Sequence, residues 1–176
     1  MRSVYQAFAC AIFAALSVGS SCDPVHGDAV DALGGEAPGV GPGPSHRGGQ
    51  PCLLCHDGAI GNPTKFSVAG TVYDAPSTAQ PVAGVTVTMT SLHDGASYTA
   101  TTNAAGNFYA TPTEWAPAYP IKVTMQSGGK SVCMTTHIGR EGSCAGCHTQ
   151  TASRASPGPV VLHPDVVVLD AGPCAP

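Results

Sequence analysis

Charged residues are scarce in this chain of 176 residues, where Lys, Arg, Asp and Glu together make up 10% of the sequence. The seven Lys and Arg residues form no cluster, and the formal net charge at pH 7 is −4. Proteins that bind phosphate backbones need a basic patch, so nucleic acid is excluded as a partner. The sequence also lacks a Gly-rich phosphate loop and a Gly-x-Ser-x-Gly elbow, which excludes two large classes of enzyme.

Long apolar runs are missing as well. The apolar run at the N-terminus covers residues 7–18, whereas a transmembrane helix needs about 20 residues. Arg2 precedes this run and small residues follow it, as in a secretory signal. The pattern therefore predicts an export signal over residues 1–21.

Two cleavage sites are compatible with this signal. Cleavage could follow Ser20, or it could precede Cys22, which would then carry a lipid. The residues before Cys22 resemble a bacterial lipoprotein signal, except at Gly19, where a large aliphatic residue is usual. In either case we expect the mature protein in the periplasm or at the surface of a bacterium, with a possible lipid anchor as its only link to the membrane.

Glycine and proline are abundant, with 22 and 16 copies, and this favours short strands and turns over long helices. Residues 22–50 have little apolar periodicity and predict a flexible tether. From about residue 66, apolar and polar residues alternate with a period of two, which is typical of half-buried strands. Strands are predicted over 66–73, 85–90, 98–102, 107–110, 119–125, 132–134, 160–162 and 166–169, with Met89 and Met125 facing the core. The fold class is therefore mainly β, with an Ig-like antiparallel sandwich over residues 66–136.

Three segments of the predicted sandwich share a pattern with a known family. They are Gly70-Thr-Val-Tyr, Pro81-Val-Ala-Gly-Val-Thr-Val and Thr102-Asn-Ala-Ala-Gly-Asn-Phe. Over roughly residues 66–126 the chain resembles the carboxypeptidase regulatory-like (prealbumin-like) β-sandwich. The resemblance implies a scaffold or binding module without catalytic residues of its own.

Two short motifs flank the predicted sandwich. Cys52-Leu-Leu-Cys55-His56 lies in residues 51–65, and Cys144-Ala-Gly-Cys147-His148 lies in residues 137–176. Both match the C-x-x-C-H signature of covalent haem attachment, and in these motifs the chain resembles c-type cytochromes. In each motif the two thiols would form thioethers to the porphyrin, and the following imidazole would be the proximal ligand of the iron.

Other chemistry is possible for four cysteines in an exported protein. The alternatives are two C-x-x-C disulfides, or one zinc ion held by all four thiols. Neither alternative accounts for a histidine after the second cysteine of both motifs. The segments around the motifs are also polar and Gly-rich, so a large apolar macrocycle would supply the core that they lack. We therefore expect two covalent haem c groups.

The ligand on the other side of each iron decides between electron transfer and ligand chemistry. Four residues are candidates for this distal position: His46, Met134, His137 and His163. Each also has an ordinary interpretation: a solvated tether residue for His46, core packing for Met134, a surface loop for His137 and a strand end for His163.

The remaining cysteines predict one further bond. With Cys10 in the signal, four cysteines on haem and Cys22 at the possible lipid site, Cys133 and Cys174 are left to form a disulfide. If Cys22 carries no lipid, three pairings are possible and one thiol is left over.

Together these features predict an exported dihaem cytochrome that transfers single electrons between extracytoplasmic redox proteins and is not an enzyme. One alternative is a haem enzyme, either peroxidase-like or nitrogen-oxide-reducing, which needs an open iron position and acid–base groups. Another is a haem-based sensor or surface-binding module.

Overall fold

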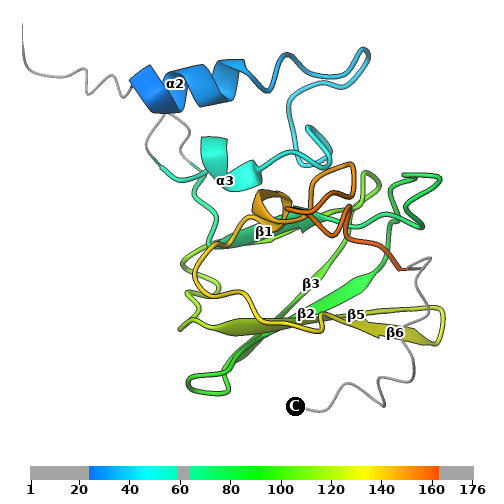
Figure 1. Cartoon of the computed structure of the whole chain (residues 1–176). Helices are drawn as coiled ribbons and strands as arrows, with labels where there is room; N and C mark the ends of the chain where they lie inside the picture. The colour runs from blue at the N-terminus through cyan, green and yellow to red at the C-terminus, as the bar shows by residue number, and fades with distance from the viewer. Residues whose placement is uncertain (1–23, 59–63, 163–176) are drawn as a thin grey trace, which may run out of the picture. The chain divides into compact units, whose positions relative to one another are not determined.

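The computed structural model describes residues 24–58 and 64–162, and the described chain is mainly β with few helical segments (Figure 1). Six strands form two antiparallel sheets of four and two strands. The mainly β class predicted from the period-two alternation is thus confirmed. The chain divides into two compact units, residues 1–32 and 33–176. The described part of the first unit is helix α2, Pro24–Asp31.

The larger sheet has the strand order β3-β2-β5-β6. Its strands are β2 (Thr86–Ser91), β3 (Ser97–Thr101), β5 (Ile121–Ser127) and β6 (Lys130–Cys133). Along β2 every second residue is fully buried, and Met89 lies opposite Val123 of β5. The threonines between them point the other way, so one face of the sheet packs on the core, as the alternation predicted.

The smaller sheet pairs β1 (Val68–Thr71) with β4 (Asn107–Ala110). All four residues of β1 are buried, whereas the alternation predicted one exposed face. The difference arises because the segment of the first motif covers the outer face of this strand: the N–H of Gly49 donates to Thr71 Oγ1 at 2.8 Å, and residues Cys52–Cys55 contact β1. A further segment pairs with the edge of β1. The backbone N–H of Ala69 donates to the carbonyl of Gly142 at 2.9 Å, and Ala69 forms a parallel bridge with Ser143. The loop that leads into the second motif therefore lies directly against β1.

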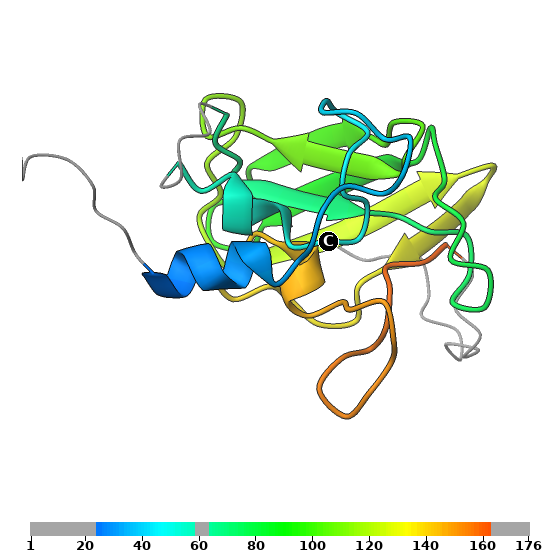
Figure 2. The ribbon, with the colours of Figure 1, turned by 90° about the horizontal axis from the view of Figure 1, so that it is seen from above.

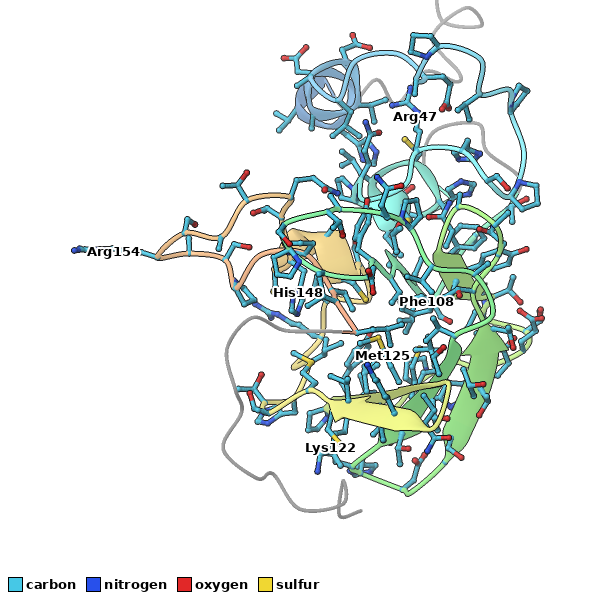
Figure 3. All side chains as sticks on the ribbon, turned by 90° about the vertical axis from the view of Figure 1, so that its right-hand side faces the viewer. Arg47, Phe108, Lys122, Met125, His148 and Arg154 are labelled. Carbon is cyan, nitrogen blue, oxygen red and sulfur yellow. The ribbon has the colours of Figure 1, made fainter. Side chains whose placement is uncertain are left out.

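The core lies between the two sheets and contains residues from most strands. It includes Val68, Val72, Val87, Met89, Phe108, Trp115, Ile121 and Met125, all of them buried. Met89 and Met125 were predicted to face the core, and this is confirmed. Figure 3 shows Phe108 and Met125 within the packed interior, while Arg154 extends from the tip of its loop into solvent.

The expectation of a structureless tether over residues 22–50 differs from the structure. Residues Pro24–Asp31 form helix α2, and the end of the segment is hydrogen-bonded to the smaller sheet. The side-chain amide of Asn107 donates to the carbonyls of Pro44 and His46 at 3.2 and 2.9 Å, and Gly49 N–H donates to Thr71 Oγ1 at 2.8 Å. Apolar periodicity could not reveal these contacts, because they are polar and join residues far apart in sequence.

The C-terminal strands also differ from expectation. Residues 160–162 form only one bridge, between Val161 and Tyr73, and the predicted strand 166–169 lies outside the described residues. No helix in the described part of the chain has the length and apolar character needed to cross a membrane.

Candidate functional site

The first motif is built on helix α3, a single turn that covers Cys52–Cys55. The N–H of His56 closes this turn by donating to the carbonyl of Cys52 at 3.0 Å. His56 is buried, with 8% of the residue exposed, and its ring Nδ1 lies 2.8 Å from the carbonyl oxygen of Thr64. A carbonyl can only accept, so Nδ1 carries the hydrogen and Nε2 carries the lone pair.

The second motif repeats this arrangement on the short helix η1, Cys144–Gly146. The N–H of His148 donates to the carbonyl of Cys144 at 2.8 Å. Its ring Nδ1 lies 2.9 Å from the carbonyl oxygen of Gly158. In both motif histidines the ring hydrogen is thus on Nδ1 and the lone pair on Nε2, and a backbone carbonyl fixes each ring. Histidines that bind metals commonly have such a second partner.

The four motif cysteines are free thiols with different surroundings. Cys147 is exposed, whereas Cys144 is buried among core residues. Burial raises the pKa of the Cys144 thiol to about 12, with a smaller contribution from Cys52. The pKa of Cys52 is also raised, again mainly by burial.

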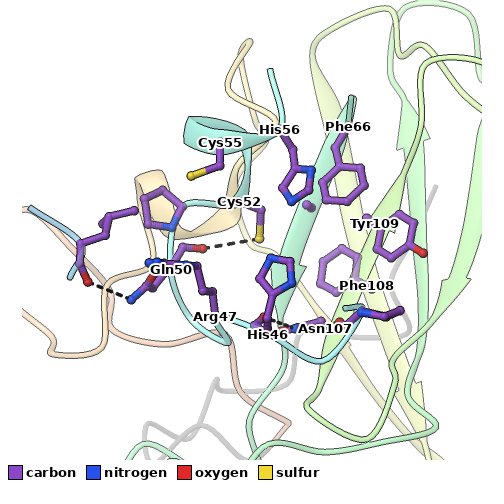
Figure 4. A pocket seen from close by; sticks show the side chains of 14 residues that line it. His46, Arg47, Gln50, Cys52, Cys55, His56, Phe66, Asn107, Phe108 and Tyr109 are labelled. Carbon is purple, nitrogen blue, oxygen red and sulfur yellow. Dashed lines mark hydrogen bonds between the residues drawn. The ribbon is translucent and has the colours of Figure 1, made fainter. Parts of the chain in front are cut away.

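A small pocket with a volume of about 50 Å³ opens in front of the first motif. We call it the motif pocket. Figure 4 shows the side chains that line it, among them His46, Cys52, Cys55, His56, Phe66 and Tyr109. The ring of His56 stacks on Phe66 with a centroid distance of 4.2 Å, and Phe66 stacks on Tyr109 at 4.5 Å. Two thiols, an oriented imidazole and an aromatic wall have the chemistry to bind a flat apolar group covalently, although the pocket in this structure is too small to enclose one.

His46, one of the candidate distal ligands, lines the same pocket. Its ring centroid lies 5.8 Å from that of His56, and the two ring planes differ by 19°. The N–H of Gly43 donates to His46 Nδ1 at 3.3 Å, so in this arrangement the hydrogen of a neutral His46 ring is on Nε2. Binding a metal through Nε2 would therefore require His46 to change tautomer and give up this long bond.

Of the other distal candidates, Met134 and His137 lie in the described part of the chain, and neither lines the motif pocket. Met134 is half-buried and packs against the core, in line with its ordinary interpretation. His137 is exposed on the loop after β6. His163 lies outside the described residues.

The remaining cysteine predictions are tested only in part. Cys133 forms a disulfide, and its partner is not a motif cysteine because those four are free. Cys174 and Cys22 lie outside the described residues, so the pairing with Cys174 and the lipid on Cys22 stay predictions.

The zinc alternative finds no support in the arrangement of the thiols. Within residues 24–58 and 64–162, no three or more His, Cys, Asp or Glu side chains are grouped so as to hold a metal ion. All four motif cysteines lie in these ranges, so a four-cysteine zinc site is not assembled.

The aromatic wall and the anchor of His46 were not predicted from the sequence. Phe66 lies in the strand predicted over 66–73, but its ring stacks on His56 and is not part of the core. Asn107 holds the carbonyl of His46, and nothing in its local sequence signals this contact across 61 positions. Phe66 itself could have signalled this wall, because it is an aromatic residue ten positions after His56, at the start of the strand predicted over 66–73.

Comparison with protein-family models, curated proteins and solved structures found no match for this chain. The two resemblances noted in the sequence thus depend on the residues quoted for them. Function is inferred from the chemistry of the site.

Proposed function

We propose that the protein is an exported dihaem c-type cytochrome that passes single electrons between extracytoplasmic redox partners. One observation carries the proposal: two C-x-x-C-H motifs each end in a histidine whose Nδ1 is held by a backbone carbonyl, at 2.8 Å for His56 and 2.9 Å for His148. This hydrogen bond puts the ring hydrogen on Nδ1 and the lone pair on Nε2, the atom that would bind the iron, and it fixes the orientation of the ring. Two motifs with the same local geometry favour two sites of the same kind.

Each residue of the motifs then has a role. Cys52 and Cys55 would hold one haem by thioether bonds, and Cys144 and Cys147 would hold the other. Bound haem supplies one-electron chemistry between ferric and ferrous iron. The β-sandwich, which we propose to be prealbumin-like, would serve as the scaffold on which the two haem loops are held.

His46 is the residue best placed to be the distal ligand of the first haem. It shares the motif pocket with His56, and the hydrogen bonds from Asn107 to the carbonyls of Pro44 and His46 fix its loop to β4. A second protein ligand closes the iron to small molecules, which favours electron transfer over enzyme or sensor functions.

The test is expression of the full chain in a host that attaches haem to C-x-x-C-H motifs, followed by intact mass and a reduced-minus-oxidised spectrum. We expect the mass of two haems and mainly low-spin iron. The variants Cys55→Ser and Cys147→Ser should each lose the stable attachment of one haem, whereas the control His137→Ala, on an exposed loop, should keep both.

Three other results would argue against an electron carrier with two haems. A colourless protein with the mass of its polypeptide and any lipid would refute it. A high-spin haem that reacts rapidly with peroxide would favour an enzyme, and carbon monoxide binding to the reduced form would favour a sensor.

A further inference from the structure

The loop of the second motif is attached to β1 by three consecutive residues, Gly142, Ser143 and Cys144, all of them buried. The carbonyl of Gly142 accepts a hydrogen bond from the N–H of Ala69, and Ser143 forms a parallel bridge with the same residue. Figure 1 shows η1, which begins at Cys144, directly beside β1. We call residues 142–144 the anchor of the loop.

The anchor is packed tightly. A Cβ built on Gly142 would lie 3.0 Å from Leu53 Cδ2 and would collide with the carbonyl oxygen of Ser67. A Cβ built on Gly70 of β1 would lie 2.7 Å from Cys144 Sγ, so this sulfur lies directly against the backbone of the strand. A thioether or any other substituent on the sulfur has no space while the anchor lies on β1. The packed loop therefore does not fit a haem bound to Cys144.

The rest of the loop is bonded mainly to itself. His148 Nδ1 lies 2.9 Å from the carbonyl oxygen of Gly158 and closes the loop. Most residues from 145 to 157 are exposed, and Figure 2 shows this orange segment extending away from the sheets. Gln150 Nε2 donates to the hydroxyl of Tyr73 at 2.8 Å, which adds one polar contact with the sandwich. A segment with few buried contacts to its surroundings can detach at a lower free energy than the whole fold needs to unfold.

The anchor also contains groups that favour water over the packed position. Ser143 Oγ is buried and has no hydrogen-bond partner in the described part of the chain, and a hydroxyl buried in this way loses the hydrogen bonds that water would supply. Burial raises the pKa of the Cys144 thiol to about 12, so its ionised form is far more stable in water than against β1. Both groups weaken the attachment of the loop.

We propose that residues 139–158 form a two-state latch. In the docked state the anchor lies on β1 and buries the Cys144 sulfur, and in the undocked state the loop leaves β1 while both sheets stay folded. A group attached to this sulfur is compatible only with the undocked state, so it holds the latch open. The inference goes beyond the proposed function because it concerns the haem-free chain, and a haem on Cys144 would be one example of such a group.

The first experiment asks whether the Cys144 thiol becomes reactive by local opening. The haem-free, full-length chain is treated with N-ethylmaleimide, which adds the sulfur to one carbon of its double bond and the thiol proton to the other. The rate at Cys144 is followed by peptide mass spectrometry at several urea concentrations below the unfolding transition. We expect the rate to stay within about twofold, because local opening exposes little surface. A rate that rises with urea as steeply as the unfolded fraction would overturn the proposal.

Hydrogen exchange then reports the position of the anchor, because the N–H of Ala69 donates to the carbonyl of Gly142. After labelling of Cys144 we expect the Ala69 amide to exchange at least about tenfold faster, while the amide of Met89 in β2 keeps its protection between β3 and β5. The control is Cys144→Ala treated with the same reagent, in which the Ala69 amide should stay protected.

Three exchange results would argue against the latch. They are unchanged exchange at Ala69 after labelling, loss of protection at Met89 as well, and a haem-free chain without protected amides. None of them alters the number of haems found by intact mass, so the latch can fail while the proposed function holds. A protein that never carries haem would refute the proposed function, whereas urea-independent labelling with faster exchange at Ala69 alone would still support the latch.

Discussion

The buried thiol of Cys144 should be the least reactive of the motif cysteines in the folded, haem-free chain. Burial moves its pKa from the ordinary value of 9.0 to about 12, and each unit is a tenfold change in the ratio of thiolate to thiol. At pH 8 the reactive thiolate of Cys144 is therefore about 10³-fold rarer than that of an unperturbed cysteine. Cys147 is exposed and serves as the internal reference.

The assay is alkylation with iodoacetamide at pH 8, with samples quenched over time and each site quantified by peptide mass spectrometry. We expect Cys144 to react at least about 10³-fold more slowly than Cys147 in the native chain, and at a similar rate in guanidinium chloride. Comparable rates in the native chain would refute the inference that Cys144 is packed against β1.

A glycine substitution tests the same packing from the other side. In Gly70→Ala the new Cβ would lie 2.7 Å from Cys144 Sγ, so the thiol has to move and its alkylation should become faster. In the control Gly139→Ala no atom lies within 4 Å of the added Cβ, and the rate should not change. If the native thiol is as unreactive as expected, a haem on Cys144, as proposed, would have to be attached while this loop is not packed on β1.

Three further predictions concern stability. Folding raises the pKa of Cys144, so this thiol stabilises the folded state below pH 9, and the stabilisation is lost as the pH rises from 9 to 12. Between pH 8 and 10 we expect the unfolding free energy of the wild type, measured with urea, to fall by about 1.4 kcal/mol relative to that of Cys144→Ala. A difference in unfolding free energy between the two proteins that does not change with pH would contradict this prediction. The variant Asn107→Ala removes the donor to the His46 carbonyl. It should lower the free energy of unfolding in urea by about 1–3 kcal/mol and shift the NMR signals of the His46 ring. Unchanged signals would argue against this anchor. The variant Met89→Ala truncates a fully buried side chain and should lower the free energy of unfolding by about 2–5 kcal/mol. The control Thr88→Ala, on the other face of the strand, should change it by no more than about 0.5 kcal/mol. Equal effects would mean that the two faces of β2 are assigned wrongly.

Much of this protein could be predicted from local patterns. The alternation of apolar residues with threonines predicted β2, because neighbouring side chains on a strand point to opposite faces, and β2 is buried at every second residue. The spacing of Cys52, Cys55 and His56 predicted that they act together, and the hydrogen bond from His56 N–H to the Cys52 carbonyl places them on one turn. Both signals are encoded within a few residues, and periodicity or spacing can detect them.

Only the tertiary structure decided which surfaces meet. The burial of both faces of β1, the approach of Leu53 to Gly142 and the placement of His46 beside His56 depend on contacts between residues far apart in the chain. Several of these contacts are made by backbone groups or by glycines, which carry no side-chain pattern that a sequence could reveal. The sequence alone therefore determined the chemistry available at each motif. That both motifs lie beside β1 was decided by tertiary packing, because only the folded chain brings distant segments within contact distance.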